Sequence, residues 1–430
     1  MNLFEYTLRT MAYAIADSRL VFVLVLLGFL LYKKNRKIAI LQRIMIGEKV
    51  ISPLELTLSQ VVMGILGGLI GSMMLSYLGV MFDIGAGIEL LFFMSLFLLV
   101  LKPRWVSFSY SAALLGSVTL ILGWLKNLNL LTSDFSIKLD IGALVALVGV
   151  LSIVEGLLIL ADGHRGAIPI FTSKDGKIAG GFSLERYWPI PIAIILFTTE
   201  ALSGGGGSTI MTPDWWPFIR GGINSSLLSA AVISAMPIYS IIGYKQITFT
   251  QSKTSKTMFS SLLKIIYGVL LIAMYKIANY GVVFQGLLLV LMPLAQGGIA
   301  FIENYIENKG NVKYVSDEEG ITILDVMPNS PAKRQGIRSG DKILEVNDDR
   351  PEEYTMIYEC INKNLADLKL KIKDKKGKIK NISFPLKSEK NTMGMILIPR
   401  GIPKGVGVVD VRETNLKDII ENIKKNRDDK

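Results

Sequence analysis

The feature that most constrains this chain is a series of long apolar segments between its first residue and residue 306. A stretch of about 20 apolar residues can cross the hydrocarbon core of a bilayer as a helix. The sequence therefore predicts an α-helical polytopic membrane domain over residues 1–306, with about nine spans. The expected spans are 11–32, 57–81, 85–102, 107–125, 141–161, 188–203, 224–243, 258–276 and 281–303.

The distribution of Lys and Arg predicts the orientation of these spans. Short cytoplasmic loops of membrane proteins are enriched in both residues. Basic loops at 33–43, 102–104, 165–186 and 245–256 alternate with poorly charged ones. This alternation places the N-terminus outside and the C-terminal residues in the cytoplasm. The net charge of +11 is spread over such loops, which favours anionic lipid headgroups of the bilayer over nucleic acid as the partner.

The composition argues against catalysis. His164 is the only histidine, so a two-histidine zinc site cannot be assembled from this chain. No nucleophile motif surrounds it, and the single cysteine, Cys360, excludes an intrachain disulfide. We expect no catalytic residue, no metal and no cofactor. A Ser-Lys dyad, which has no tight sequence signature, stays open.

One ionisable residue lies deep inside an expected span. Glu155 falls within 141–161, where a carboxylate is costly unless it is protonated or paired, for example with Lys264. Such a residue is an intramembrane functional candidate. A helix-packing contact is favoured over transport, because transporters are usually built from repeats with broken helices and the two halves of the chain show no convincing repeat.

Two other segments are not simple spans. A Lys-Asp-Gly turn separates the β-compatible runs 167–172 and 177–182, which predicts a cytoplasmic hairpin able to pack on the C-terminal domain. Four glycines at 204–207 precede Trp215 and Trp216. This pattern is typical of a flexible turn followed by a segment at the membrane surface.

Residues 307–400 have the pattern of a small soluble α+β domain. Ser330 can cap a short helix, Pro331 suits its first position and Gly336 suits its left-handed end. The full motif consists of Ser330, Pro331, Ala332, Gly336, Gly340 and Asp341. A helix at 352–362 and a hairpin of alternating apolar and polar residues, LKLKIKD and GKIKNISFPL, follow.

This order of elements resembles bacterial PDZ domains. The resemblance implies a groove between a strand and the longer helix, in which an extended peptide adds as an extra strand. It also implies a hydrophobic-Gly-hydrophobic loop that holds the peptide carboxylate. The segment before Ile321 lacks that pattern, and we favour Met393-Gly394-Met395 in a permuted arrangement. The expected groove residues are Met393, Gly394, Met395, Ile396, Tyr354, Ile357, Tyr358 and Ile361.

Residues 401–430 predict a linker and an amphipathic C-terminal helix. One stripe of this helix carries Leu416, Ile419, Ile420 and Ile423. We favour packing of the stripe on the preceding domain, with a partner helix or the membrane surface as alternatives.

The whole chain resembles the MinJ-like division-site topology determinants. The resemblance is carried by a first span followed by YKKNRK, by GGFSLERYW, by WWPF and by the Ser330–Asp341 motif. It implies a non-enzymatic membrane scaffold that recruits division-machinery proteins of the DivIVA and MinCD types, enriched at the septum and poles and compatible with a homo-oligomer. Two alternatives stay open: a PDZ-containing regulator of a membrane protease, and a transporter with a regulatory PDZ domain.

Overall fold

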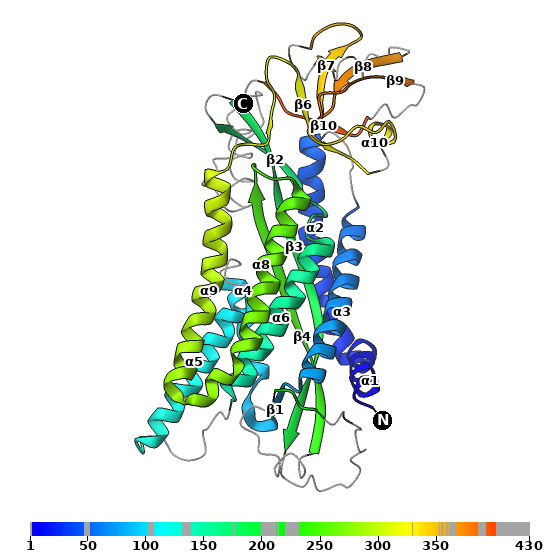
Figure 1. Cartoon of the computed structure of the whole chain (residues 1–430). Helices are drawn as coiled ribbons and strands as arrows, with labels where there is room; N and C mark the ends of the chain where they lie inside the picture. Colours follow the sequence, from blue (N-terminus) through cyan, green and yellow to red (C-terminus); the bar gives the residue numbers. More distant parts are fainter. Residues whose placement is uncertain are drawn as a thin grey trace.

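The computed structural model describes residues 2–46, 52–101, 107–130, 139–174, 177–198, 212, 215–219, 232–328, 330–351, 353, 356–357, 360, 367–385 and 393–400. Figure 1 shows an elongated N-terminal domain, in which helices surround two long strands, and a smaller C-terminal domain at one end of it. The N-terminus lies toward the opposite end. The expected C-terminal helix over 415–424 lies outside the described residues.

Helices make up most of the N-terminal domain. They are α1 (Leu3–Ala16), α2 (Ser18–Ile46), α3 (Pro53–Leu78), α4 (Glu89–Leu101), α5 (Phe108–Asn127), α6 (Ile141–Asp162), α8 (Lys253–Met274) and α9 (Val282–Lys309), with 3-10 turns at Ile84–Ala86 and Tyr275–Tyr280. Five helices are long and apolar enough to cross a membrane, or six if the pair α1 and α2, bent by 67°, is one span. The described helices are therefore compatible with a multi-pass membrane protein.

Two of the expected helical spans are strands. β3 (Lys177–Thr198) and β4 (Val232–Thr248) pair antiparallel from Phe182↔Thr248 to Thr198↔Val232, so the helices predicted at 188–203 and 224–243 are wrong wherever these residues are described. Pro189 and Pro191 disfavour a helix interior, because proline lacks the N–H and clashes with the preceding turn. A strand buried on both faces reads as one continuous apolar run, which resembles a buried helix.

β3 is the central strand of a five-stranded sheet. It pairs with β4, with β1 (Met81–Asp83), with β2 (Ile168–Lys174) and with β5 (Tyr314–Val315). The β2–β3 pairing runs from Ile168↔Ser183 to Lys174↔Lys177, so the hairpin predicted at 167–182 is confirmed. The first residues of β3 form this hairpin and the rest of the strand enters the N-terminal domain.

Helix α3 covers the edge of β3 between β1 and β2. An added Cβ atom would lie 2.1 Å from the Pro189 carbonyl oxygen at Gly64, and 1.9 Å from the Pro191 oxygen at Gly68. One turn further, Ser72 Oγ accepts the backbone N–H of Ala193 at 2.9 Å. The prolines present no N–H to this edge. Helix and strand backbones therefore meet directly, and the one donor facing Ser72 is satisfied.

Helix α8 has its polar face inward. Lys256, Ser260 and Lys264 are buried, whereas Met258 and Leu262 are more than half exposed. A helix on the surface of a water-soluble protein has the opposite arrangement. This inverted pattern is what we expect of a helix that faces lipid on one side and a polar interior on the other.

The C-terminal domain contains β6 (Ile321–Val326), α10 (Pro331–Arg334), β7 (Lys342–Val346), β8 (Asp367–Lys373), β9 (Ile379–Pro385) and β10 (Met395–Leu397), in the sheet order β10-β6-β7-β8-β9. Ser330 Oγ accepts the N–H of Lys333 at 3.2 Å, and Gly336 has a φ of 78°. The cap and the left-handed helix end predicted from the sequence are thus confirmed.

Candidate functional site

The strand β10 ends the C-terminal sheet. It pairs antiparallel with β6, through Met395↔Val326, Ile396↔Asp325 and Leu397↔Ile323. Within the described part of the chain, β6 is its only strand partner. A terminal strand is where an added peptide strand can extend a sheet.

The loop before β10 is held against the start of α10. The carbonyl of Gly394 accepts the N–H of Met327 at 2.8 Å, and that of Met393 accepts the N–H of Ala332 at 3.2 Å. Gly394 has a φ of 69°, and a Cβ atom there would lie 2.4 Å from the Cβ of Ser330. Two sequence signals more than 60 residues apart, the Ser330 motif and the Met-Gly-Met loop, therefore meet in one place.

The two faces of β10 contact different domains. Met393, Met395 and Leu397 lie in the buried cluster of the C-terminal domain, which also contains Ile357. Ile396 instead belongs to the buried cluster of the N-terminal domain, together with Ile398 and Leu324.

The expected groove residues are either buried or lie outside the described residues. Met393, Met395 and Ile357 are buried in the C-terminal core and Ile396 faces the N-terminal domain, so none of these four side chains lines an open groove. Met356, Ile357 and Cys360 are helical, which agrees with a helix in 352–362. Tyr354, Tyr358 and Ile361 lie outside the described residues.

The C-terminal domain is seated on the β2–β3 hairpin, as the sequence predicted for that hairpin. A Cβ atom at Gly180 would lie 2.9 Å from Ile398 Cδ1 and 3.0 Å from Leu324 Cδ1. Beside this contact, Lys253 Nζ at the start of α8 pairs with the Asp325 carboxylate of β6 at 2.6 Å. Gly180 also pairs with Tyr314 of β5.

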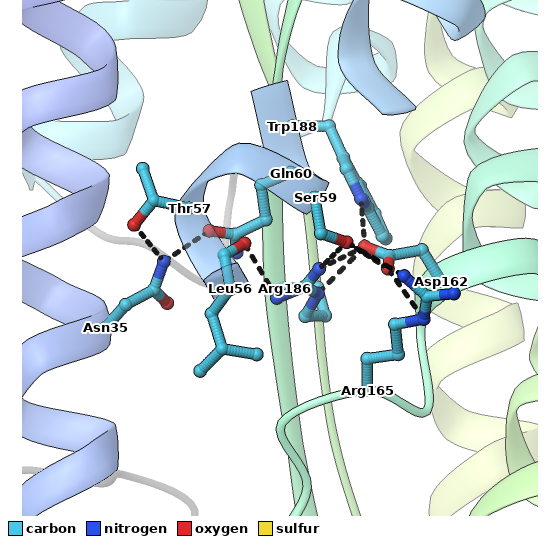
Figure 2. Close-up of polar contacts among 9 residues, drawn as sticks. All are labelled: Asn35, Leu56, Thr57, Ser59, Gln60, Asp162, Arg165, Arg186 and Trp188. Carbon is cyan, nitrogen blue, oxygen red and sulfur yellow. Dashed lines mark hydrogen bonds and ion pairs between the residues drawn. The ribbon is translucent and has the colours of Figure 1, made fainter. Parts of the chain in front are cut away.

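A buried carboxylate ties three elements of the N-terminal domain together near the same end. Figure 2 shows Asp162 at the end of α6 with donors converging on it: Ser59 Oγ at 2.9 Å, Arg186 Nε at 2.9 Å and Trp188 Nε1 at 2.8 Å. Asp162 and Arg186 are at most 1% exposed. This pair was not predicted from the sequence; its signal is the arginine and tryptophan of GGFSLERYW inside a largely apolar run.

A second polar contact in Figure 2 joins α2 to α3. The side-chain amide of Asn35 donates to Thr57 Oγ1 at 2.9 Å and to Gln60 Oε1 at 2.6 Å. All three residues are buried. Both contacts hold α3 at the position where its glycines meet β3.

Glu155 has the partner that the sequence suggested. Lys264 Nζ lies 2.8 Å from Glu155 Oε1 and donates to Gln296 Oε1 at 3.1 Å. The adjoining cavity of about 10 Å³ has room for one water molecule, far below the size of a solute site.

A larger hollow of about 330 Å³ lies elsewhere in the N-terminal domain. Asp140, Asn279 and Gln285 line it together with neighbouring apolar residues. Asp140 is 15 residues from Glu155, or roughly 22 Å along α6. Glu155 is therefore a paired residue inside the helix packing, and the hollow is separate from it.

Metal chemistry has no candidate among the residues that the structure covers. There, no group of three His, Cys, Asp or Glu side chains could hold an ion. Asp162 and Arg186, Glu155 and Lys264, and Asp325 and Lys253 are instead paired with one another.

Comparison with known proteins agrees with the fold of the C-terminal domain. The sequence profile of the PDZ domain matches residues 306–380. A search of curated proteins gave no match. β10 lies beyond the matched residues and yet completes the sheet beside β6. Residues 306–380 are therefore a PDZ domain, a module that binds peptides of partner proteins, and the strand that flanks it follows later in the chain.

Proposed function

We propose that this protein is a non-enzymatic membrane scaffold, in which the PDZ domain recruits partner proteins by pairing an extended segment with β10. The observation that carries the proposal is the position of β10 at the end of the sheet, directly after the Met393-Gly394-Met395 loop. Main-chain pairing supplies affinity in such complexes, and side-chain pockets supply selectivity. The apolar segments of the N-terminal domain supply the anchor.

The proposed finer role is placement of the division site. It is supported by the resemblance to MinJ-like determinants, which implies cytoplasmic partners of the DivIVA and MinCD types at the septum and poles. A PDZ domain attached to a multi-pass anchor suits that role, because it needs capture at a membrane and no chemistry.

A photoreactive residue at position 356 of the full-length chain, expressed in cells, tests the peptide site, because Met356 is half-buried and adjoins Ile357, which packs with Met393 and Met395. We expect it to cross-link a partner protein. The same residue at position 381, on the far strand β9, serves as the control and should capture at most a trace. Equal capture from both positions would contradict the proposal. Capture of a membrane protease would instead favour protease regulation.

A glycine pair sharpens this experiment. Gly394 and Gly377 both have positive φ values, 69° and 81°, so alanine strains the backbone at either position. Only Gly394 adjoins other atoms, those of Ser330 and Met327; Gly377 has none within 4 Å. We expect Gly394→Ala to reduce cross-linking at least tenfold, about 1.4 kcal/mol or more, and Gly377→Ala to leave it unchanged.

Imaging tests the division role. A fluorescent fusion of the full-length protein should concentrate at septa in dividing cells of the source organism, and Gly394→Ala should displace the partner from them. Uniform membrane fluorescence with normally placed septa in the Gly394→Ala strain would reject the division role while leaving the scaffold proposal intact.

A further inference from the structure

One of the two faces of the strand β10 packs against the N-terminal domain. The strand has only three residues, and its outer side chains, Ile396 and the following Ile398, are 6% and 0% exposed. These side chains are buried in the cluster that contains Phe182 and Ile178 of β3. A PDZ domain without the hairpin would present this apolar face to water.

This face of β10 packs on the β2–β3 hairpin around Gly180, a surface that we call the seat. At Gly180 of β3, even a Cβ atom would lie within 3.0 Å of both Ile398 and Leu324. The ring of Phe182 meets the ring of Tyr314 edge-on at 6.0 Å. The fit is therefore close, and a larger side chain at position 180 must displace the side chains of Ile398, next to β10, and of Leu324 in β6.

Two polar contacts fix the position of the sheet on this seat. Lys253 Nζ lies 2.6 Å from the Asp325 carboxylate, next to the β6–β10 pairing. Ser316 Oγ donates to the Ile398 carbonyl at 2.7 Å and accepts the N–H of Thr322 at 3.0 Å. The end of β10 is thus held by the segment that connects the two domains.

We infer that the β2–β3 hairpin and the start of α8 are positioning elements of the peptide site. They hold β10 in the conformation that a ligand strand must meet, so a ligand does not have to order it. By linkage, a ligand on β10 tightens the seat by the same factor as the seat strengthens ligand binding. The inference rests on the proposed function of β10 and adds the residues that regulate it, Gly180 and Lys253.

Hydrogen exchange of the full-length protein in lipid nanodiscs tests the positioning without any ligand. Gly180→Val should raise the exchange of amides 395–398 by about tenfold or more, and Lys253→Gln by about threefold, because both favour local opening. Lys371→Gln is the matched control: it breaks a 2.8 Å pair with Glu345 in the same PDZ domain, away from the seat. Unchanged exchange in Lys253→Gln and Gly180→Val would overturn the inference.

Cross-linking from position 356 tests the effect on the ligand. Its yield should fall about fivefold in Lys253→Gln, as expected for a loss of pre-organisation, and stay constant in Lys371→Gln. Faster exchange with an undiminished yield would overturn the inference and leave the proposed function standing. Absence of cross-linking in the unsubstituted chain would overturn the proposed function, and the inference with it.

Discussion

The two sheets of this molecule differ in how the edges of their strands are covered. In the N-terminal sheet, β3 is buried from Ile178 to Leu196, and its edge is closed by strands and by the glycine face of α3. In the PDZ sheet, the inner face is apolar, whereas the outer face carries Lys369, Lys371 and Lys373, and β10 ends the order of strands. Both edges of the central strand β3 are therefore engaged within the molecule. The second sheet ends in β10, the strand on which we propose that a peptide pairs.

The largest effect should follow from removing Asp162, the buried carboxylate at the end of α6 that pairs with Arg186 of β3 in the first sheet. Asp162→Ala leaves Arg186 charged and buried without its partner, which we expect to lower the free energy of unfolding by about 3–5 kcal/mol. Titration of the purified protein with a denaturing detergent measures this loss. Glu345→Ala, which removes the partly exposed pair with Lys371 in the second sheet, should cost about 0–1 kcal/mol. Similar losses in both variants would show that the two sheets are not different in this respect.

Closure of the edge of β3 gives the next prediction. Gly68→Ala places a methyl group against the Pro191 carbonyl, and we expect a loss of about 1–3 kcal/mol from forced separation of α3 and β3. The same detergent titration applies. Gly286→Ala in α9 is the control, since its Cβ atom would have no neighbour within 4 Å. A stable Gly68→Ala protein would mean that helix and strand do not meet as closely as described.

The next prediction concerns a local contact of the PDZ domain, the cap of helix α10. Ser330→Ala removes the cap of α10, and we expect a loss of about 1 kcal/mol, seen as faster exchange of the amides in 332–336. Ser330→Asp keeps an acceptor at the cap and should restore most of the protection. If both variants exchange equally fast, the cap is not the stabilising contact.

The smallest effect concerns pH at the β8–β9 turn. The backbone N–H groups of Lys378 and Lys376 hold the pKa of Asp374 below its ordinary value of 3.8. A carboxylate with a lowered pKa in the fold stabilises it above its unfolded pKa, and that contribution is lost as the pH falls below about 4. The protection of the turn amides, measured as their exchange relative to the intrinsic rate at each pH, should therefore decrease below that pH. In Asp374→Asn the pH-dependent part of this decrease should be absent.

The sequence predicted the parts of the fold that have local signals. The capped helix at Ser330, the β2–β3 hairpin and the Glu155–Lys264 pair each follow from a short motif or from the cost of an isolated charge. The described parts of the spans predicted at 188–203 and 224–243 form strands instead; they resembled helices because β3 is buried on both faces and lacks the alternation that marks a strand, and because β4 is likewise a largely apolar run. Their clearest signal was the spacing of Pro189 and Pro191, which is incompatible with a helix interior.

The candidate site was only partly predictable. The Met-Gly-Met loop is visible in the sequence, but the pairing of β10 with β6 joins segments about 70 residues apart. Alternation indicates that Met395 and Ile396 point to opposite faces. It does not tell which face meets a second domain, because that depends on the seat at Gly180. The Asp162–Arg186 pair was missed for the same reason, since its partners lie 24 residues apart on different elements.

The paired strands at the centre of the N-terminal domain constrain how such a protein is made. A helix satisfies its own backbone and can enter a bilayer alone, whereas a single strand exposes its peptide groups to hydrocarbon. Within a bilayer, β3 and β4 would therefore have to pair with each other, and with the glycine face of α3, before their peptide groups could leave water.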